Sequence, residues 1–113
     1  MERKKELKQQ YQEIAIVAGV YQIKNNINGK VFIDSTRNLK TINGVKFSLE
    51  NGAFHNKELQ LEWSNYGKDA FSIDILEKLK VEDSPYFNEK EALKELENKW
   101  LEQLQPYGER GYL

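Results

Sequence analysis

One short stretch, residues 18–38 (AGVYQIKNNINGKVFIDSTRN), constrains the fold of this chain more than any other. Two runs rich in β-branched and aromatic residues, 19–25 and 30–34, flank the dipeptide Asn28-Gly29. Asn-Gly suits the positive-φ corner of a tight turn, so the pattern predicts a β-hairpin. Side chains alternate faces along a strand. With an even-numbered loop, one face of the hairpin carries Tyr21, Ile23, Phe32 and Asp34, and the other carries Val20 and Val31.

The rest of the chain shows mostly helical spacing of its apolar residues. This spacing predicts an amphipathic N-terminal helix over 2–13 and a helix capped by Ser35 or Thr36 that runs to about Leu49, with a break plausible at Gly44. Two more helices are predicted over 56–66 and 88–105, and alternation over 71–76 predicts a third strand. The pattern predicts one α+β domain, 1–113, with a three-stranded antiparallel sheet flanked by helices and a helical N-terminal extension, 1–17.

Composition narrows the function classes. The chain has no cysteine, which excludes disulfides and thiolate metal sites, and no apolar run long enough to span a membrane. We therefore expect a cytoplasmic protein. Seventeen basic residues against eighteen acidic ones give a net charge of −1, so the charge balance by itself supplies no phosphate-binding surface.

The last predicted helix contains an anomaly at Glu97. Its apolar arc consists of Leu93, Leu96, Trp100, Leu101 and Leu104, and Glu97 falls inside this arc. Carboxylates are almost never fully buried unless they are paired or bound to a cation. Glu97 therefore either lies at the edge of the arc, or pairs with a lysine, or projects into a site where it can hold a divalent metal.

The hairpin resembles the signature of the GIY-YIG nuclease family. The first motif reads Gly19-Val20-Tyr21, and the second, degenerate one reads Phe32-Ile33-Asp34 at the usual separation. The likeness continues through STRNLK, HNKELQLEWSNYG, FSIDILEKL, ELENKWLEQL and the closing GYL. Within the family, the chain looks most similar to the phage-type homing endonuclease-like branch. The resemblance implies the same small three-stranded sheet flanked by helices.

The resemblance also implies site residues. Tyr21 matches the active-site tyrosine that helps to activate the attacking water, and Phe32 stands in the place of the second tyrosine. Glu97, three residues before Trp100, matches the glutamate that binds the metal, Mg²⁺ or Mn²⁺. The catalytic candidates are therefore Tyr21, Phe32 and Glu97, with Glu97 as the metal ligand.

Other positions depart from the family pattern. Phe32 lacks the second hydroxyl, Asp34 replaces a glycine, and Leu113 stands where the family tends to carry a polar residue. The family's catalytic arginine should fall near position 41 or 42, where the chain has threonine and isoleucine. Arg37, a turn too early, and Lys46, a turn too late, are the phosphate-binding candidates nearest to it. His55, the only histidine, is expected to be exposed or capping.

Three functions remain open from the sequence. In the first, the chain is an inactive or very weak nuclease domain that binds DNA or a protein partner. In the second, it is an active divalent-metal-dependent DNA endonuclease with a rewired site. In the third, it is a purely structural or protein-binding domain, which the net charge and Asp34 favour. A positive groove would favour nucleic acid and an acidic or apolar surface would favour protein; the residues that would make this groove are Lys24, Lys30, Arg37, Lys40 and Lys46.

Overall fold

The computed structural model describes residues 16–81 and 84–113. Its main elements in chain order are β1 (Gly19–Asn25), β2 (Val31–Thr36), α2 (Ile42–Glu50), α3 (Lys57–Tyr66), β3 (Phe71–Lys78) and α4 (Glu89–Leu104). Short 3₁₀ turns lie at Leu39–Thr41, Lys68–Ala70 and Gly108–Arg110. The N-terminal helix predicted over 2–13 falls outside the described residues, and residues 16–18 have no regular structure.

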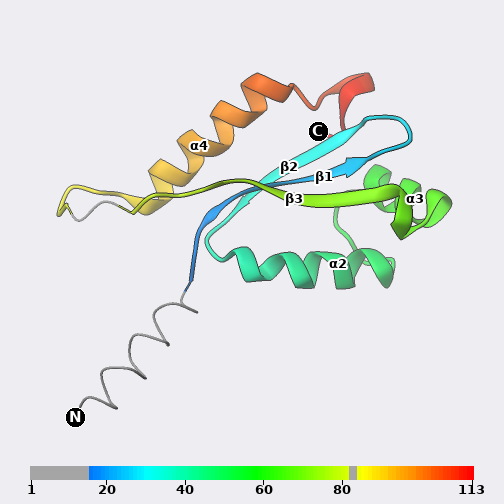
Figure 1. The fold of residues 1–113 in the computed structure, drawn as a ribbon, viewed down its shortest axis with the longest axis horizontal. Coiled ribbons are helices and arrows are strands. Elements are labelled where there is room, and N and C mark those ends of the chain that lie inside the picture. Colours follow the sequence, from blue (N-terminus) through cyan, green and yellow to red (C-terminus); the bar gives the residue numbers. More distant parts are fainter. Residues whose placement is uncertain (1–15, 82–83) are drawn as a thin grey trace, which may run out of the picture.

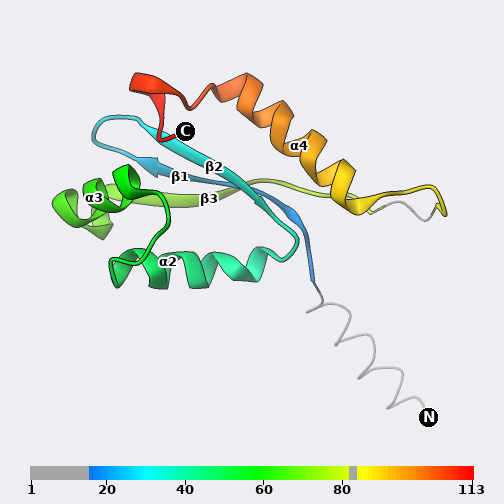
Figure 2. The same cartoon turned by 180° about the vertical axis from the view of Figure 1, so that it is seen from behind.

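The three strands form one antiparallel sheet in the order β2-β1-β3. Helices α2 and α3 cover one face of this sheet and α4 crosses the other (Figure 1), an arrangement that the view from behind shows equally well (Figure 2). The α+β architecture predicted from the sequence is therefore confirmed. Among the described helices, none is long and apolar enough to cross a membrane.

The hairpin has the register that its alternation predicts. Tyr21 lies opposite Asp34, and Ile23 lies opposite Phe32, so these four side chains share one face. Gly29 has φ of 78° at the turn, a conformation that favours glycine. The face of Tyr21 packs on α2 and α3, and the core there consists of Tyr21, Ile23, Phe32, Leu49, Phe54, Leu59, Trp63, Phe71 and Tyr112.

The predicted helix start at Ser35 or Thr36 is wrong. Strand β2 continues through both residues, with Thr36 paired to Gly19, so neither is available as a cap. Asn38 caps the following 3₁₀ turn instead, because its side chain accepts a hydrogen bond of 3.0 Å from the Lys40 amide. Helix α2 then runs without a break through Gly44.

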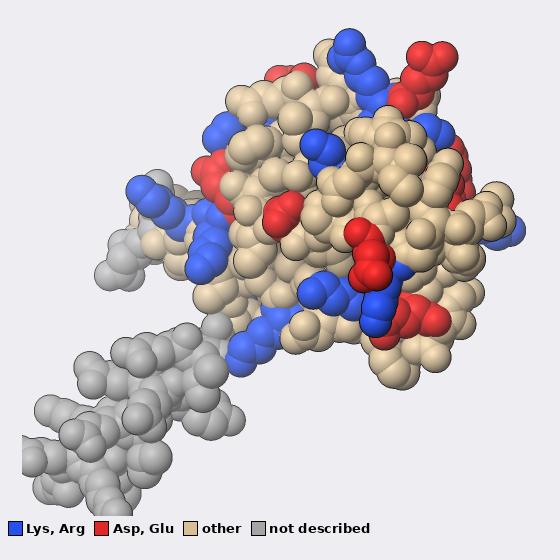
Figure 3. Space-filling view, turned by 45° about the vertical axis from the view of Figure 1, so that its right-hand side comes forward, with Lys and Arg blue, Asp and Glu red and all other residues tan. Residues whose placement is uncertain are grey.

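Charged side chains of both signs are mixed over the surface. On the side of the molecule seen in Figure 3, Lys and Arg alternate with Asp and Glu and form no broad patch of one sign. This distribution fits the near-zero net charge of the sequence.

The C-terminal segment returns to the sheet. Gly111 forms a parallel bridge with Val31, and the Tyr112 amide donates to the Val31 carbonyl at 3.1 Å. A Cβ atom at Gly111 would overlap the backbone of Pro106, so this close approach requires glycine. The segment thereby places the Tyr112 ring in the core between β1 and α3.

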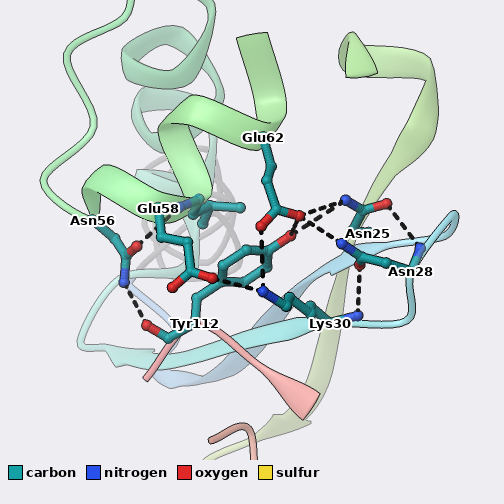
Figure 4. A network of polar contacts seen from close by, with 8 residues as sticks. Asn25, Asn28, Lys30, Asn56, Glu58, Glu62 and Tyr112 are labelled. Carbon is teal, nitrogen blue, oxygen red and sulfur yellow. Dashed lines mark hydrogen bonds and ion pairs between the residues drawn. The ribbon is translucent and has the colours of Figure 1, made fainter. Parts of the chain in front are cut away.

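A polar network centred on Glu62 ties this segment to the hairpin turn (Figure 4). Glu62 Oε1 accepts hydrogen bonds from Tyr112 Oη at 3.0 Å, Asn28 Nδ2 at 2.6 Å and Asn25 Nδ2 at 3.2 Å. Lys30 lies 3.5 Å from Glu62 Oε2. Asn25 is fully buried, and its Oδ1 accepts from the amide of Ile27, so the network satisfies a polar side chain in the core.

Candidate functional site

Tyr21 and Asp34 form a cross-strand pair at the end of the sheet. Tyr21 is only 3% exposed, and it lies directly across from Asp34 in the β1–β2 register. Burial raises the pKa of the Tyr21 phenol far above its usual range, and the charge and hydrogen bond of Asp34, with the charge of Glu97, raise it further. Tyr21 is therefore held as a neutral phenol in this arrangement.

Glu97 reaches this pair from the opposite face of the sheet, across the edge strand β2. Its Oε1 accepts hydrogen bonds from the Ser35 amide at 2.9 Å and from the Ser35 hydroxyl at 2.8 Å. These bonds explain how a carboxylate within the apolar arc of α4 is accommodated without a lysine partner in the described structure. Ser35, 62 residues away in the sequence, was not predicted as its partner.

The carboxyl groups of Asp34 and Glu97 also interact with each other. Burial raises the pKa of Asp34, and the charge of Glu97 and a hydrogen bond to it raise it further, while the Ser35 amide and the charge of His55 act in the opposite direction. The two carboxyl groups therefore oppose each other's negative charge, and a proton or a cation between them would relieve this repulsion.

Replacing Asp34 by asparagine is expected to raise the melting temperature at pH 8 and to change it much less at pH 3. The pKa of Asp34 is raised in the folded state, so its contribution to stability is present at low pH and is lost as the pH rises through the folded pKa. Asparagine never carries the charge. Thermal melts at both pH values in a chelator test this, with Asp74→Asn, an exposed position of β3, as the control. An equal gain in melting temperature at pH 3 and at pH 8 would show that the negative charge of Asp34 is not the cause.

His55 lies beside the cluster, although its place in the HNKEL stretch was the only signal for it in the sequence. Its ring is 4.4 Å from the Phe54 ring and 5.9 Å from the Phe32 ring, and its charge acts on Asp34. The side chain is exposed, as expected, while the following residue, Asn56, caps α3. His55 is therefore an exposed side chain that packs on the edge of the Phe32–Phe54 cluster.

Of the remaining candidates, Phe32 lies on the Tyr21 face but is buried. Its ring packs edge-on against Phe54 at 5.4 Å, and it has no polar atom to offer a substrate. Arg37 is 76% exposed and pairs with Glu89 at 3.3 Å. Lys46 lines a separate cavity that includes Trp63. Phosphate binding by Arg37 and Lys46 stays a prediction, and within the described residues no hydrogen bond or ion pair joins either side chain to the Tyr21 cluster.

The donor set fits a divalent cation of the Mg²⁺ or Mn²⁺ class. Asp34 and Glu97 supply carboxylate oxygens next to the Ser35 hydroxyl, and Mg²⁺ is commonly held by one or two carboxylates together with substrate phosphates. No group of three or more potential metal-ligating residues (His, Cys, Asp or Glu) occurs in the part of the chain that the structure describes. The protein would therefore contribute two ligands and leave the other positions to water or phosphate.

Comparisons with known proteins agree with the fold. The chain is 34% identical to the intron-associated endonuclease 1 of Enterobacteria phage T4 over 88 residues, which are 77% of this chain and 33% of that protein. It thus spans about a third of the length of this relative. No protein-family model matches the chain.

Two solved structures are similar over most of their length. The structure of the catalytic domain of the homing endonuclease I-TevI is 33% identical with a TM-score of 0.63, and it matches over 84% of this chain and 95% of the domain. A mutant of the same catalytic domain is 31% identical with a TM-score of 0.66, over 87% of this chain and 93% of the domain. With the hairpin motifs, the sheet order and these similarities together, the chain belongs to the GIY-YIG nuclease family.

Proposed function

We propose that this chain is a GIY-YIG domain that works by binding and does not cleave phosphodiesters efficiently. DNA is the first candidate ligand and a protein is the alternative. The observation that carries the proposal is the cluster of three acidic groups, Tyr21, Asp34 and Glu97, in which the phenol is buried against two carboxyl groups.

The state of Tyr21 opposes a role in activating water. A phenol acts as a base near neutral pH only if its pKa is lowered, and here burial, Asp34 and Glu97 all raise the pKa of Tyr21. The Asp34 carboxylate also adds negative charge on the face that a phosphate must approach. A bound divalent cation would supply positive charge at this position.

The groups that would stabilise the transition state of phosphoryl transfer are also missing or already paired with a carboxylate. Phe32 has no hydroxyl, and the chain has threonine and isoleucine at positions 41 and 42, where the family resemblance places an arginine. The guanidinium of Arg37 pairs with Glu89 on α4. A positive group aimed at developing charge contributes roughly 3–4 kcal/mol to catalysis, so its loss slows cleavage by about 100-fold to 1,000-fold.

A plasmid-nicking assay with Mg²⁺ and with Mn²⁺ tests this proposal. We expect the wild-type chain to show no nicking, or only nicking that Glu97→Ala retains and that therefore comes from elsewhere. A gel-shift titration with duplex DNA at two salt concentrations runs in parallel and measures binding. Nicking by the wild type that disappears in Glu97→Ala would overturn the proposal.

One observation favours the active alternative. Asp34 adds a second carboxylate beside Glu97, and this pair is suited to a divalent cation. In this reading Glu97 and Asp34 would hold the metal, and Tyr21 would orient the attacking water. Nicking that depends on both carboxylates, tested with Asp34→Asn and Glu97→Gln, would support it.

A further inference from the structure

A cavity lies on the face of the sheet opposite the Tyr21 cluster. It has a volume of about 460 Å³ and opens between the sheet, the end of α4 and the C-terminal 3₁₀ turn. Gln22 and Lys24 form part of its floor, and they alternate along β1 with Tyr21 and Ile23, which point the other way. The cavity is therefore separate from the candidate active site.

Two cations of this cavity are unpaired in the described structure. Lys24 and Arg110 are both exposed and line the cavity, and neither side chain has a hydrogen-bond or ion-pair partner among the described residues. Lys30 and Lys99, by contrast, are paired with glutamates. Glu109 is the one carboxylate in the lining, so the lining carries a positive balance.

An aromatic side chain lines the same cavity as these cations. The Trp100 indole lines the cavity with Leu76 and Leu104. Its Nε1 donates to Glu77 Oε1 at 3.0 Å, and the Lys99 ammonium lies 5.5 Å from the ring centroid. These contacts hold the ring in place, which lowers the entropic cost of packing a ligand against it.

We propose that this cavity binds a short stretch of single-stranded nucleic acid. Lys24 and Arg110 contact its phosphates, and a base packs against Trp100 and the two leucines. Sites for single strands combine unpaired cations with an aromatic platform, whereas the bases of a duplex are stacked on each other and cannot reach an indole. The volume is that of a small-ligand site and suits one or two nucleotides. The inference goes beyond the proposed function and does not depend on what happens at Tyr21.

Fluorescence anisotropy with a labelled ten-nucleotide oligothymidylate tests the proposal. We expect Lys24→Ala/Arg110→Ala to weaken binding at least tenfold and to reduce the slope of log K against log salt by about 1.4, because two phosphate contacts are lost. Lys90→Ala/Lys94→Ala removes the same charge from exposed positions of α4 and is expected to stay within about twofold of the wild type. Circular dichroism melts check that each variant folds.

Intrinsic fluorescence locates the bound strand, because the chain has two tryptophans and Trp63 is buried in the core. Oligothymidylate is expected to quench the fluorescence of the Trp63→Phe variant, in which Trp100 remains. It should leave the fluorescence of the Trp100→Phe variant, in which Trp63 remains, unchanged. Absence of this quenching, unchanged affinity of Lys24→Ala/Arg110→Ala, or tighter binding of duplex than of single strand would each overturn the proposal. Preferential binding of an acidic peptide such as polyglutamate would also overturn it and assign the cavity to protein.

The two proposals fail separately. Nicking that depends on Glu97, together with binding of single strands that depends on Lys24 and Arg110, would overturn the proposed function and support this inference. If the chain does not nick plasmid, and the cavity substitutions do not change its affinity for oligothymidylate, the proposed function is supported and this inference is overturned.

Discussion

Replacing Glu62 by alanine is expected to lower the free energy of unfolding by about 3 kcal/mol. The carboxylate is 14% exposed and accepts hydrogen bonds from Asn25, Asn28 and Tyr112 while it pairs with Lys30. Its loss leaves the buried Asn25 amide and the Tyr112 hydroxyl without their acceptor. Urea denaturation at pH 7 measures the effect, and a drop of more than about 10 °C in melting temperature should accompany it.

The matched control is Glu58→Ala. Glu58 also pairs with Lys30, at 2.7 Å, but its side chain is 51% exposed. An exposed ion pair contributes little, so this variant is expected to lose less than about 1 kcal/mol. Equal losses in the two variants would show that the network of Figure 4 contributes no more than a surface ion pair.

The stability due to Glu62 should also depend on pH. Burial opposes its ionisation, but the hydrogen bonds from Asn28 and Tyr112 and the charge of Lys30 hold the pKa of Glu62 below its usual range. A lowered folded pKa gives stability that is present above the unfolded pKa, about 4.3, and is lost as the pH falls through the folded pKa. The difference in the free energy of unfolding between the wild type and Glu62→Ala is therefore expected to shrink as the pH falls from about 5 to about 2.

Rebuilding the missing groups is expected to produce nuclease activity. A triple variant, Phe32→Tyr/Asp34→Gly/Ile42→Arg, should nick plasmid at least about 100-fold faster than the wild type with Mg²⁺. It restores a hydroxyl, removes the negative charge beside Tyr21 and supplies a guanidinium at the start of α2. Because Ile42 packs against the core, Thr41→Arg, at an exposed position, is built in parallel as the third substitution.

The single variant Asp34→Gly separates the contributions. It removes the charge but leaves the guanidinium absent, so we expect it not to cleave. Glu97→Ala in the triple background should abolish nicking and so exclude contamination. Cleavage by Asp34→Gly alone, at the rate of the triple variant, would show that the arginine is not required in this chain.

Only part of the site could be predicted from the sequence, and the reason is physical. Glu97 was identified as an anomaly because one carboxylate interrupts an apolar helical arc, which is a local pattern. Its partner Ser35, the contact of its carboxyl group with Asp34, and the approach of His55 all join segments distant in the sequence. No spacing rule along one chain encodes such contacts, because they depend on how α4 crosses the sheet edge.

The cap of the first helix shows the same limit on a smaller scale. Ser35, Thr36 and Asn38 are all good capping residues, so the local signal did not distinguish them. Tertiary structure decided, because pairing with β1 extended β2 through Thr36 and left Asn38 as the first residue free to cap.

By itself the sequence determined the hairpin, its register and the α+β class, because turn chemistry and the alternation of side chains are local and strong. Only the tertiary structure decided what surrounds Tyr21 and Glu62. The two residues differ in the groups that the fold places next to them. Burial raises the pKa of Tyr21, and the neighbouring carboxyl groups raise it further, whereas hydrogen-bond donors around Glu62 lower its pKa in spite of burial. The neighbouring groups come from strands and helices that meet only in the folded chain.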